Sequence, residues 1–315
     1  MKSIWKRFDR LTSCFLQRYW RLSLWAFLVT LAGWPGSASA EVVATDATGA
    51  KIRLAAPARR IVSLAPHITE LVYAAGAGDK LVGTVDYGDY PPPAKALPHV
   101  GGYARLDLEA IARLKPDLVL AWVSGNAPAD LDRLRALGIA VFVSQPDQIE
   151  DVAADIERYA TLAGSQGQPA AQAFRQRLDG LRQRYSREPT VTVFYQIYKE
   201  PLMTINDRQI ISDSIRLCGG RNVFGDLPVL AATVTTEAVL TANPEVIVAS
   251  GMGDERPEWL DDWRRWKSLK AVKADNLFFI PPEEIQRHTP RLLDGAAKLC
   301  AALATARTRR QAITD

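Results

Sequence analysis

Aromatic and polar side chains follow several predicted buried strands, and these residues have the chemistry to bind a ligand. The stretch Asp86–Pro93 (DYGDYPPP) follows an apolar run that ends near Thr84, and Trp122 directly follows the run Leu118–Ala121. The polar stretch Pro281–Arg291 (PPEEIQRHTPR) separates the last predicted strand from the last predicted helix. Ligands of open α/β sheets approach the carboxyl ends of the strands. We therefore expect these three places to line a binding cleft.

Each of these places also has a structural explanation, and the residues alone leave both open. The proline run could hold tyrosine rings at a cleft edge, or it could form a surface turn with packed tyrosines. Trp122 and Tyr103, which follows two glycines, are as typical of a core as of a ligand contact. Thr289 and Pro290 fit the cap and the first turn of a helix.

Catalytic motifs are missing where a strand meets a helix. The sequence has no G-x-S-x-G elbow, Walker loop, H-E-x-x-H or G-x-G-x-x-G at such a junction. This argues against an enzyme, although a site assembled from distant residues would escape the search. His67, His99 and His288 have no metal-ligand partner at a fixed spacing, so we predict loop or cap roles for them and no metal site.

One segment of the chain occurs twice. Glu109-Ala-Ile, four residues and the apolar stretch Pro116–Ala121 return as Glu237-Ala-Val, four residues and Pro244–Ala249, 128 residues later. An acid begins a short helix, a proline ends it, and a buried strand follows. This repeat predicts two α/β lobes of similar build, with a cleft for a small ligand.

The two repeated glutamates allow two interpretations. Pseudo-twofold symmetry would place Glu109 and Glu237 on one outer surface, where they could dock on a symmetric basic partner. Alternatively, each acid stabilises the dipole of its own helix by about 0.3–1 kcal/mol. The residues alone favour the second interpretation.

Strand and helix patterns alternate along most of the chain, which predicts wrapped parallel sheets. An entry hairpin precedes them, and we expect a helix to begin at Thr69 and a frayed polar tail over Arg307–Asp315. Two helices over Asp151–Leu162 and Gln168–Arg187 predict a rigid connector that permits small tilting motions. The other predicted strands lie at 60–64, 81–84, 118–121, 140–143, 190–197, 246–249 and 276–280, and the other helices at 128–137, 208–218 and 290–304.

Residues 1–40 are typical of a secretory signal peptide. A basic stretch precedes the apolar run Leu22–Trp34, and the small residues Ala38-Ser39-Ala40 form a cleavage site before Glu41. The alternative is an uncleaved anchor. Six of the 39 basic and one of the 35 acidic residues lie in this leader, which leaves 33 against 34. The basic character therefore belongs to the leader, and we expect no nucleic-acid partner.

Two cysteines, Cys218 and Cys300, remain in the exported part. An oxidising compartment and an even count favour one disulfide between the start of the second lobe and its last helix. Two buried free thiols are the alternative, and a zinc site is disfavoured by the small number of sulfur ligands.

Four motifs together resemble the helical-backbone periplasmic binding proteins of ABC importers, and among these the chain is most similar to the cobalamin-binding type. The resemblance covers residues 59–305 and implies two Rossmann-like lobes, a long interdomain helix, no catalysis, and delivery of a ligand to a membrane permease. The motifs are Arg60–Glu70 (RIVSLAPHITE), Tyr87–Pro92 (YGDYPP), Leu108–Trp122 (LEAIARLKPDLVLAW) and Cys218–Phe224 (CGGRNVF).

The resemblance also implies roles for single residues. Tyr87 matches a tyrosine that lies against the corrin ring, Trp122 matches a cleft tryptophan, and Tyr103 stands where the cobalamin-binding type has another tryptophan. The stretch Glu283-Glu284-Ile285-Gln286-Arg287 matches its ligand-contacting loop. Glu109 and Glu237 match acids that pair with permease arginines, which favours docking, and Cys218 and Cys300 match a disulfide.

Two departures put the ligand in question. Ala231 stands near an expected cleft tryptophan, and Glu284 replaces an aromatic residue. Haem would need an iron ligand such as Tyr87, Tyr90, Tyr103 or His67, and a siderophore would need a basic cleft, for which Arg287 and Arg291 are available.

We therefore predict an exported, monomeric α/β protein with two Rossmann-like lobes joined by a long interdomain helix. Its predicted parts are the signal peptide (1–40), an N-terminal lobe (41–160), a linking helix (161–187) and a C-terminal lobe (188–315). The predicted function is to capture cobalamin as a transported ligand, without a cofactor, and to present it to the permease dimer of an ABC importer. Haem or siderophore binding is one alternative, and a secreted enzyme acting on a metal chelate is another.

Overall fold

The structure, a computed structural model, describes residues 41–102, 105–251 and 255–314. The predicted signal peptide and Tyr103 lie outside these residues. The description begins with the expected hairpin, β1 (Val42–Thr45) paired with β2 (Lys51–Leu54). Within the described residues, no helix combines the length and the apolar content that a bilayer crossing requires.

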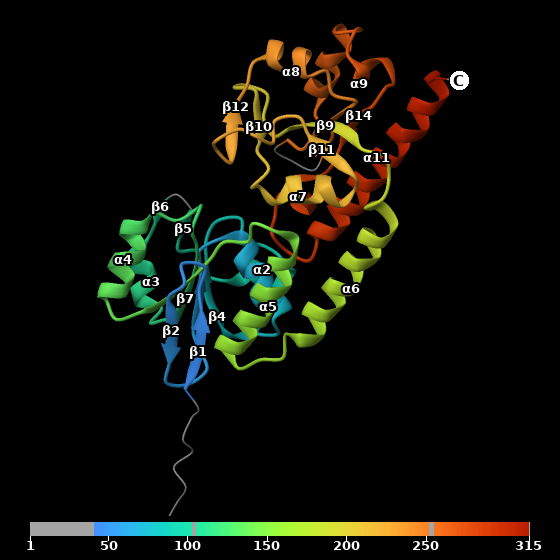
Figure 1. Cartoon of the computed structure of the whole chain (residues 1–315). Coiled ribbons are helices and arrows are strands. Elements are labelled where there is room, and N and C mark those ends of the chain that lie inside the picture. Colours follow the sequence, from blue (N-terminus) through green and yellow to red (C-terminus); the bar gives the residue numbers. More distant parts are fainter. Residues whose placement is uncertain (1–40, 103–104, 252–254, 315) are drawn as a thin grey trace, which may run out of the picture. The chain divides into compact units, whose positions relative to one another are not determined.

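The first lobe is built on a parallel sheet with the strand order β4-β3-β7-β8. Figure 1 shows this lobe in blue to green. Its strands are mostly buried, with at most one half-buried residue each, as expected for a parallel sheet covered on both faces. Helix α2 begins at Pro66 and not at Thr69 as predicted, because a proline fits the first helical turn. The strands are β3 (Ile61–Ser63), β4 (Leu81–Thr84), β7 (Leu118–Trp122) and β8 (Ala140–Ser144), and the helices are α2 (Pro66–Ala74), α3 (Leu108–Arg113) and α4 (Pro128–Ala136).

The second lobe repeats this plan with the parallel order β11-β9-β13-β14. The repeated sequence segment forms α3 and β7 in the first lobe and α8 and β13 in the second, and both strands are third in the orders given. The expectation of two similar α/β lobes is therefore confirmed. The strands are β9 (Val191–Gln196), β11 (Gly220–Asn222), β13 (Val246–Ala249) and β14 (Leu277–Phe279), and the helices are α7 (Ile210–Leu217), α8 (Thr236–Ala242), α9 (Lys270–Lys273), α10 (Pro282–Ile285) and α11 (Leu292–Thr314).

Several short elements were not predicted from the sequence. Two small antiparallel sheets pair neighbouring loops, and three 3₁₀ helices connect the larger elements. They are β5 (Gly101–Gly102) with β6 (Arg105–Leu106), β10 (Met203–Ile205) with β12 (Ala231–Thr233), and the 3₁₀ helices η1 (Gly78–Lys80), η2 (Pro92–Ala96) and η3 (Glu258–Arg265).

Helices α5 (Ile149–Ala163) and α6 (Gln168–Tyr185) connect the lobes close to the predicted positions. Gly164, with a positive φ of 62°, ends α5. Ion pairs fasten the two helices together, including a bidentate contact from Arg175 to Glu157 at 2.6 and 2.7 Å. The lobe limits drawn at residues 160 and 187 stay a prediction.

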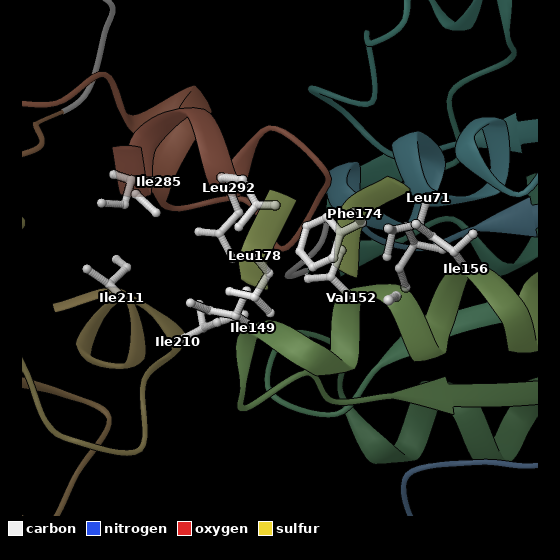
Figure 2. Packing of buried hydrophobic residues seen from close by; sticks show 14 of the residues in the cluster. Leu71, Ile149, Val152, Ile156, Phe174, Leu178, Ile210, Ile211, Ile285 and Leu292 are labelled. Carbon is white, nitrogen blue, oxygen red and sulfur yellow. The ribbon is translucent and has the colours of Figure 1, made fainter. Parts of the chain in front are cut away.

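The largest hydrophobic core runs through the connector into both lobes (Figure 2). Leu71 of α2 and Ile211 of α7 belong to the same buried cluster as Phe174 and Leu178 of α6. Because this cluster is continuous, we call it the interlobe core.

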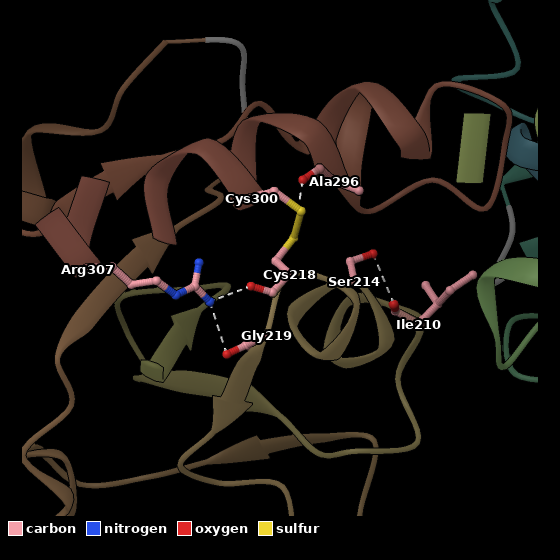
Figure 3. Close-up of a disulfide and its surroundings, with 7 residues drawn as sticks. All are labelled: Ile210, Ser214, Cys218, Gly219, Ala296, Cys300 and Arg307. Atoms are coloured by element: carbon pink, nitrogen blue, oxygen red, sulfur yellow. Dashed lines mark hydrogen bonds between the residues drawn. A yellow bond between two sulfur atoms is a disulfide. The ribbon is translucent and has the colours of Figure 1, made fainter. Parts of the chain in front are cut away.

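Helix α11 is longer than the sequence suggested. It extends to Thr314, so the prediction of a frayed tail from Arg307 onward is wrong. Arg307 is only 7% exposed, and its guanidinium donates to the carbonyls of Cys218 and Gly219 at 2.7 and 3.2 Å (Figure 3). It also donates to the Pro189 carbonyl at 2.7 Å. These acceptors are distant in sequence, which is why the local polarity of the segment misled the prediction.

The predicted disulfide between Cys218 and Cys300 is present and joins the end of α7 to α11 (Figure 3). Both cysteines are fully buried. This bond and the Arg307 hydrogen bonds lie close together and fix α11 against the start of β11.

Replacing Arg307 by alanine should lower the free energy of unfolding by about 1.5–3 kcal/mol, because buried carbonyls lose a charged donor. Gln311→Ala, on an exposed position of the same helix, is the control and should change it by less than about 0.5 kcal/mol. Urea denaturation checks both variants, and equal stabilities would contradict the assigned role of Arg307.

Candidate functional site

A cavity of about 330 Å³ is lined by residues from both lobes. The first lobe contributes the ends of β7 and β8 and the loops that follow them, as expected for the carboxyl edge of a parallel sheet. The second lobe contributes the start of α7, β12 and the loop before α11. The lining residues used below are Trp122, Ser124, Gln145 and Asp147 from the first lobe, and Arg208, Gln209, Ile210, Ala231, Gln286 and His288 from the second.

Trp122 ends β7, and its position is set by the loop that follows. The side chain of Asn126 accepts a hydrogen bond from the Trp122 backbone at 2.8 Å and donates to the Leu64 carbonyl at 3.0 Å. A Cβ atom at Gly125 would lie 2.0 Å from the indole ring, so only glycine lets the loop pass this closely. The indole nitrogen is buried and has no hydrogen-bond partner among the described residues. Trp122 therefore presents a fixed aromatic wall to the cavity.

His67 and His288 pack against Trp122, although they are 221 residues apart. The ring centroids of the three residues are separated by 5.0–5.8 Å, with edge-on or tilted geometry. Both imidazoles are buried, at 4% and 6% exposure. His67 lies in the first turn of α2 and His288 in the loop before α11, as the loop or cap prediction allows, but the sequence did not show that the two rings are buried and meet. We call His67, Trp122 and His288 the ring cluster.

Burial keeps both imidazoles of the ring cluster uncharged. It lowers the pKa of His288 to about 4, against the opposing effect of the carboxylate of Asp147. Burial also lowers the pKa of His67 well below 6.5, and the neighbouring His288 and Arg287 add to the effect. The imidazole of His288, which lines the cavity, and that of His67, which lies behind it, are therefore both neutral.

Tyr87 lies in the stiff loop that follows β4. Its side chain is exposed, with 73% of its surface accessible, and its φ of 64° is unusual for a residue other than glycine. The interpretation of this loop as a turn with packed tyrosines therefore fails for Tyr87. Strained backbone that presents a large aromatic ring to solvent is typical of a binding residue. Tyr87 does not line the cavity.

Charged side chains join the two lobes beside the cavity. Arg291 makes a bidentate contact with Glu70 of α2 at 2.7–3.2 Å and lies 3.9 Å above the ring of Tyr90. Arg287 pairs with Glu283 at 2.7 Å and with Asp89 at 3.6 Å. We call these ion pairs the interlobe network. They place the loop of Tyr87 beside the loop of Glu283 and Arg287, as the sequence interpretation required.

The remaining residues of the predicted contact loop point to different surroundings. Gln286 lines the cavity and donates to the Ser250 carbonyl at 2.6 Å. Glu284 instead binds Lys298 at 2.6 Å, and Ile285 is fully buried in the interlobe core. These contacts give Glu284 and Ile285 structural roles, and their contact with a ligand stays a prediction. Ala231 lines the cavity with a small side chain.

Glu109 and Glu237 occupy equivalent first-turn positions of α3 and α8. Both side chains are exposed, and Glu109 pairs with Arg113 at 3.2 Å. The side chains of Asp107 and Thr235 cap the two helices in the same way. Each accepts a hydrogen bond from the backbone N–H of the residue three positions later. The structure therefore repeats an exposed acid in each lobe, and its use in docking stays a prediction.

Sequence reasoning missed the ring cluster, the Glu70–Arg291 pair and the contribution of α7. His288, Glu70 and Arg291 all lie inside stretches that the sequence singled out. No local signal, however, shows that residues more than 200 positions apart meet. The start of α7 could have been found, because Arg208 and Gln209 are polar residues directly before an apolar helix.

Comparison with known proteins assigns the fold to a family. The model of the periplasmic binding protein family matches residues 61–284. The chain belongs to this family. It is 40% identical over 250 residues to the vitamin B12-binding protein of Vibrio cholerae, covering 78% of this chain and 90% of that protein.

Solved structures agree with this assignment. The crystal structure of the periplasmic vitamin B12 binding protein BtuF of Vibrio cholerae superposes with a TM-score of 0.74 at 39% identity, covering 80% of this chain and 98% of that one. The periplasmic heme-binding protein RhuT from Roseiflexus sp. RS-1 superposes with a TM-score of 0.66 at 23% identity, covering 79% and 98%. The second likeness shows the fold alone.

The free energy of unfolding should fall as the pH drops from about 6.5 towards 4. The folded-state pKa values of His67 and His288 lie below 6.5, so the unfolded chain binds more protons in this window. His67→Phe keeps a ring in the cluster but removes one titrating group, so its stability should fall less. Urea denaturation of both proteins at about pH 7 and about pH 5 compares the two losses. Equal losses would contradict a buried, neutral His67.

Proposed function

We propose that this protein captures a corrinoid such as cobalamin in the cleft between its lobes and delivers it to an ABC importer. The observation that carries the proposal is the 40% identity to a vitamin B12-binding protein, which extends over both lobes. The cavity supports it, because Trp122 and apolar residues of α7 line it and suit a ring-shaped molecule. Tyr87, exposed on the loop that follows β4, would supply a second aromatic surface.

The charges around the cleft favour a corrinoid over a haem or a siderophore. Haem carries two carboxylates and a ferric siderophore is anionic, so both would need cationic side chains in the cleft that are not already paired with carboxylates. Arg287 and Arg291 are already paired with carboxylates of the interlobe network. Arg208 and Asp147 line the cavity with opposite charges. A cobalamin, with amide side chains and a single phosphodiester, suits such a balanced surface.

Haem remains the second candidate because of one observation. The imidazole of His288 faces the cavity and is neutral, which suits an axial ligand for haem iron. In this alternative the fold and the direction of transport are unchanged. Binding without chemistry is the function in both cases, and we propose no enzymatic reaction and no resident cofactor.

Export and docking complete the proposed function. The predicted leader would bring the protein to the periplasm, where the Cys218–Cys300 disulfide is stable. There the protein would act as a monomer. Glu109 and Glu237, repeated in the two lobes, would contact basic residues of the two halves of a permease dimer. Neither glutamate lines the cavity, so docking and ligand binding use separate residues.

Purified protein should bind cyanocobalamin with one-to-one stoichiometry and quench tryptophan fluorescence, because Trp122 lines the cavity. Trp122→Ala should weaken binding by about 1–3 kcal/mol, the range typical of a central aromatic contact. Trp259→Ala, at a tryptophan of the second lobe outside this cavity, is the matched control. Titration with haemin under the same conditions decides between the candidates. A Soret shift with haemin and no response to cobalamin would exclude a corrinoid as the ligand.

Replacing Glu109 and Glu237 together by alanine should abolish cobalamin uptake by cells and leave the affinity of the purified protein unchanged. The control replaces Glu200 and Glu258, which are also exposed acids, and should support normal uptake. The measurement is accumulation of labelled cobalamin in cells that lack their own receptor. Normal uptake in the Glu109/Glu237 variant would eliminate these residues as the docking contacts.

A further inference from the structure

Arg208 lines the cavity with a positive charge that no carboxylate neutralises. Among the described lining residues, the two charged side chains are Arg208 from the second lobe and Asp147 from the first. Within the part of the chain that the structure describes, no aspartate or glutamate forms an ion pair with Arg208. Arg287 and Arg291, by contrast, are held by carboxylates of the interlobe network. An unpaired cation at a cavity suits a negative group on the ligand.

The backbone of Arg208 is fixed by a buried side chain. Asn206, which is 2% exposed, accepts a hydrogen bond from the Arg208 backbone N–H at 3.1 Å and donates to the Leu227 carbonyl at 2.9 Å. Ser212 of α7 donates to the Asn206 carbonyl at 2.8 Å. The turn before α7 is therefore held from two sides, and the base of the Arg208 side chain is placed before a ligand arrives.

The guanidinium group of Arg208 has donors left for a ligand. One of its nitrogens donates to the Pro228 carbonyl over a long contact of 3.4 Å. An arginine carries five N–H donors in a planar fork, which matches two oxygens of a phosphate. Apolar side chains of the second lobe line the same cavity, and a charge pair beside such a surface is stronger than one in open water. They are Ile197, Ile205, Ile210, Ile211 and Leu230.

We infer that Arg208 binds the phosphodiester of the nucleotide loop of a corrinoid and thereby favours complete corrinoids over cobinamide, which lacks the nucleotide and its phosphate. The inference rests on the proposed function. Cobalamin carries a single negative charge outside its corrin ring, on this phosphodiester, and its other polar side chains are neutral amides. One unpaired cation matches one such charge, whereas haem would bring two carboxylates.

Asp147 makes this recognition selective for a single phosphate. Its carboxylate lines the cavity from the first lobe and accepts a hydrogen bond from the side chain of Gln145 at 2.9 Å. A ligand with several negative groups would place one of them near Asp147, where like charges repel. A corrinoid can direct its phosphate to Arg208 and present neutral amides to Asp147.

The test measures the affinity of the purified protein for three cyanide-ligated corrinoids by isothermal titration calorimetry. They are cobalamin, cobinamide, and cobinamide phosphate, which has a phosphate but no ribose or base. Native protein should bind the two phosphate-bearing compounds about 10-fold more tightly than cobinamide, as expected for one charge-assisted contact. Arg208→Gln should remove this difference and leave the affinity for cobinamide unchanged. Arg208→Lys, which keeps the charge, should restore most of it, and added salt should reduce the selectivity of native protein.

Arg221→Gln is the matched control, because Arg221 is an exposed arginine of β11 that does not line the cavity. All three affinities should match those of native protein. Equal native affinities for cobinamide and cobinamide phosphate would overturn the role of Arg208 and leave the proposed function intact, and so would an equal loss of all three affinities in Arg208→Gln. Native protein that binds none of the corrinoids would overturn the proposed function itself.

Discussion

The interlobe core is the constraint on which the rest of the structure depends. Apolar side chains from α2, α5, α6, α7 and α11 form one buried cluster, so the lobes cannot separate widely without exposing it to water. The backbone of Ile149 also donates to Asp213 of α7 at 2.9 Å, which fixes the start of the connector against the second lobe. Ligand entry must therefore use small tilting of the lobes about the interlobe core.

The interlobe network shows where such tilting is easiest. The Glu70–Arg291 pair is nearly buried, and breaking it would leave an uncompensated charge at a cost of about 3–5 kcal/mol. The Arg287–Asp89 contact is longer, at 3.6 Å, and Asp89 is largely exposed, so water can replace its partner. The resistance to opening therefore decreases from the interlobe core towards the loop of Asp89. Movement of Arg287 away from the first lobe breaks this weaker contact, whereas its shorter ion pair, with Glu283 at 2.7 Å, lies within its own loop.

The sequence predicted those parts of the structure whose cause is local. Buried strands, short helices and the internal repeat follow from residue periodicity, and the cleft follows from the position of Trp122 and the Tyr87 loop after their strands. The ring cluster, the Arg291 pair and the true end of α11 depend on contacts between distant segments. A loop or cap role was predicted for His288 because such a role needs only neighbours in sequence. Its real partners, His67 and Trp122, become neighbours only when both lobes fold.

Ligand binding and docking on a two-fold symmetric partner place different symmetry requirements on this fold. The exposed acids Glu109 and Glu237 repeat at equivalent positions, which suits a partner built from two similar halves. The cavity has no such repeat, because Trp122 lines it from the first lobe, whereas Ser250, the equivalent position of the repeated segment in the second lobe, is not among its lining residues. The second lobe contributes an imidazole instead of a second indole. An asymmetric cavity can distinguish the two faces of a flat ring, and the symmetric acids can remain constant while the cavity residues change.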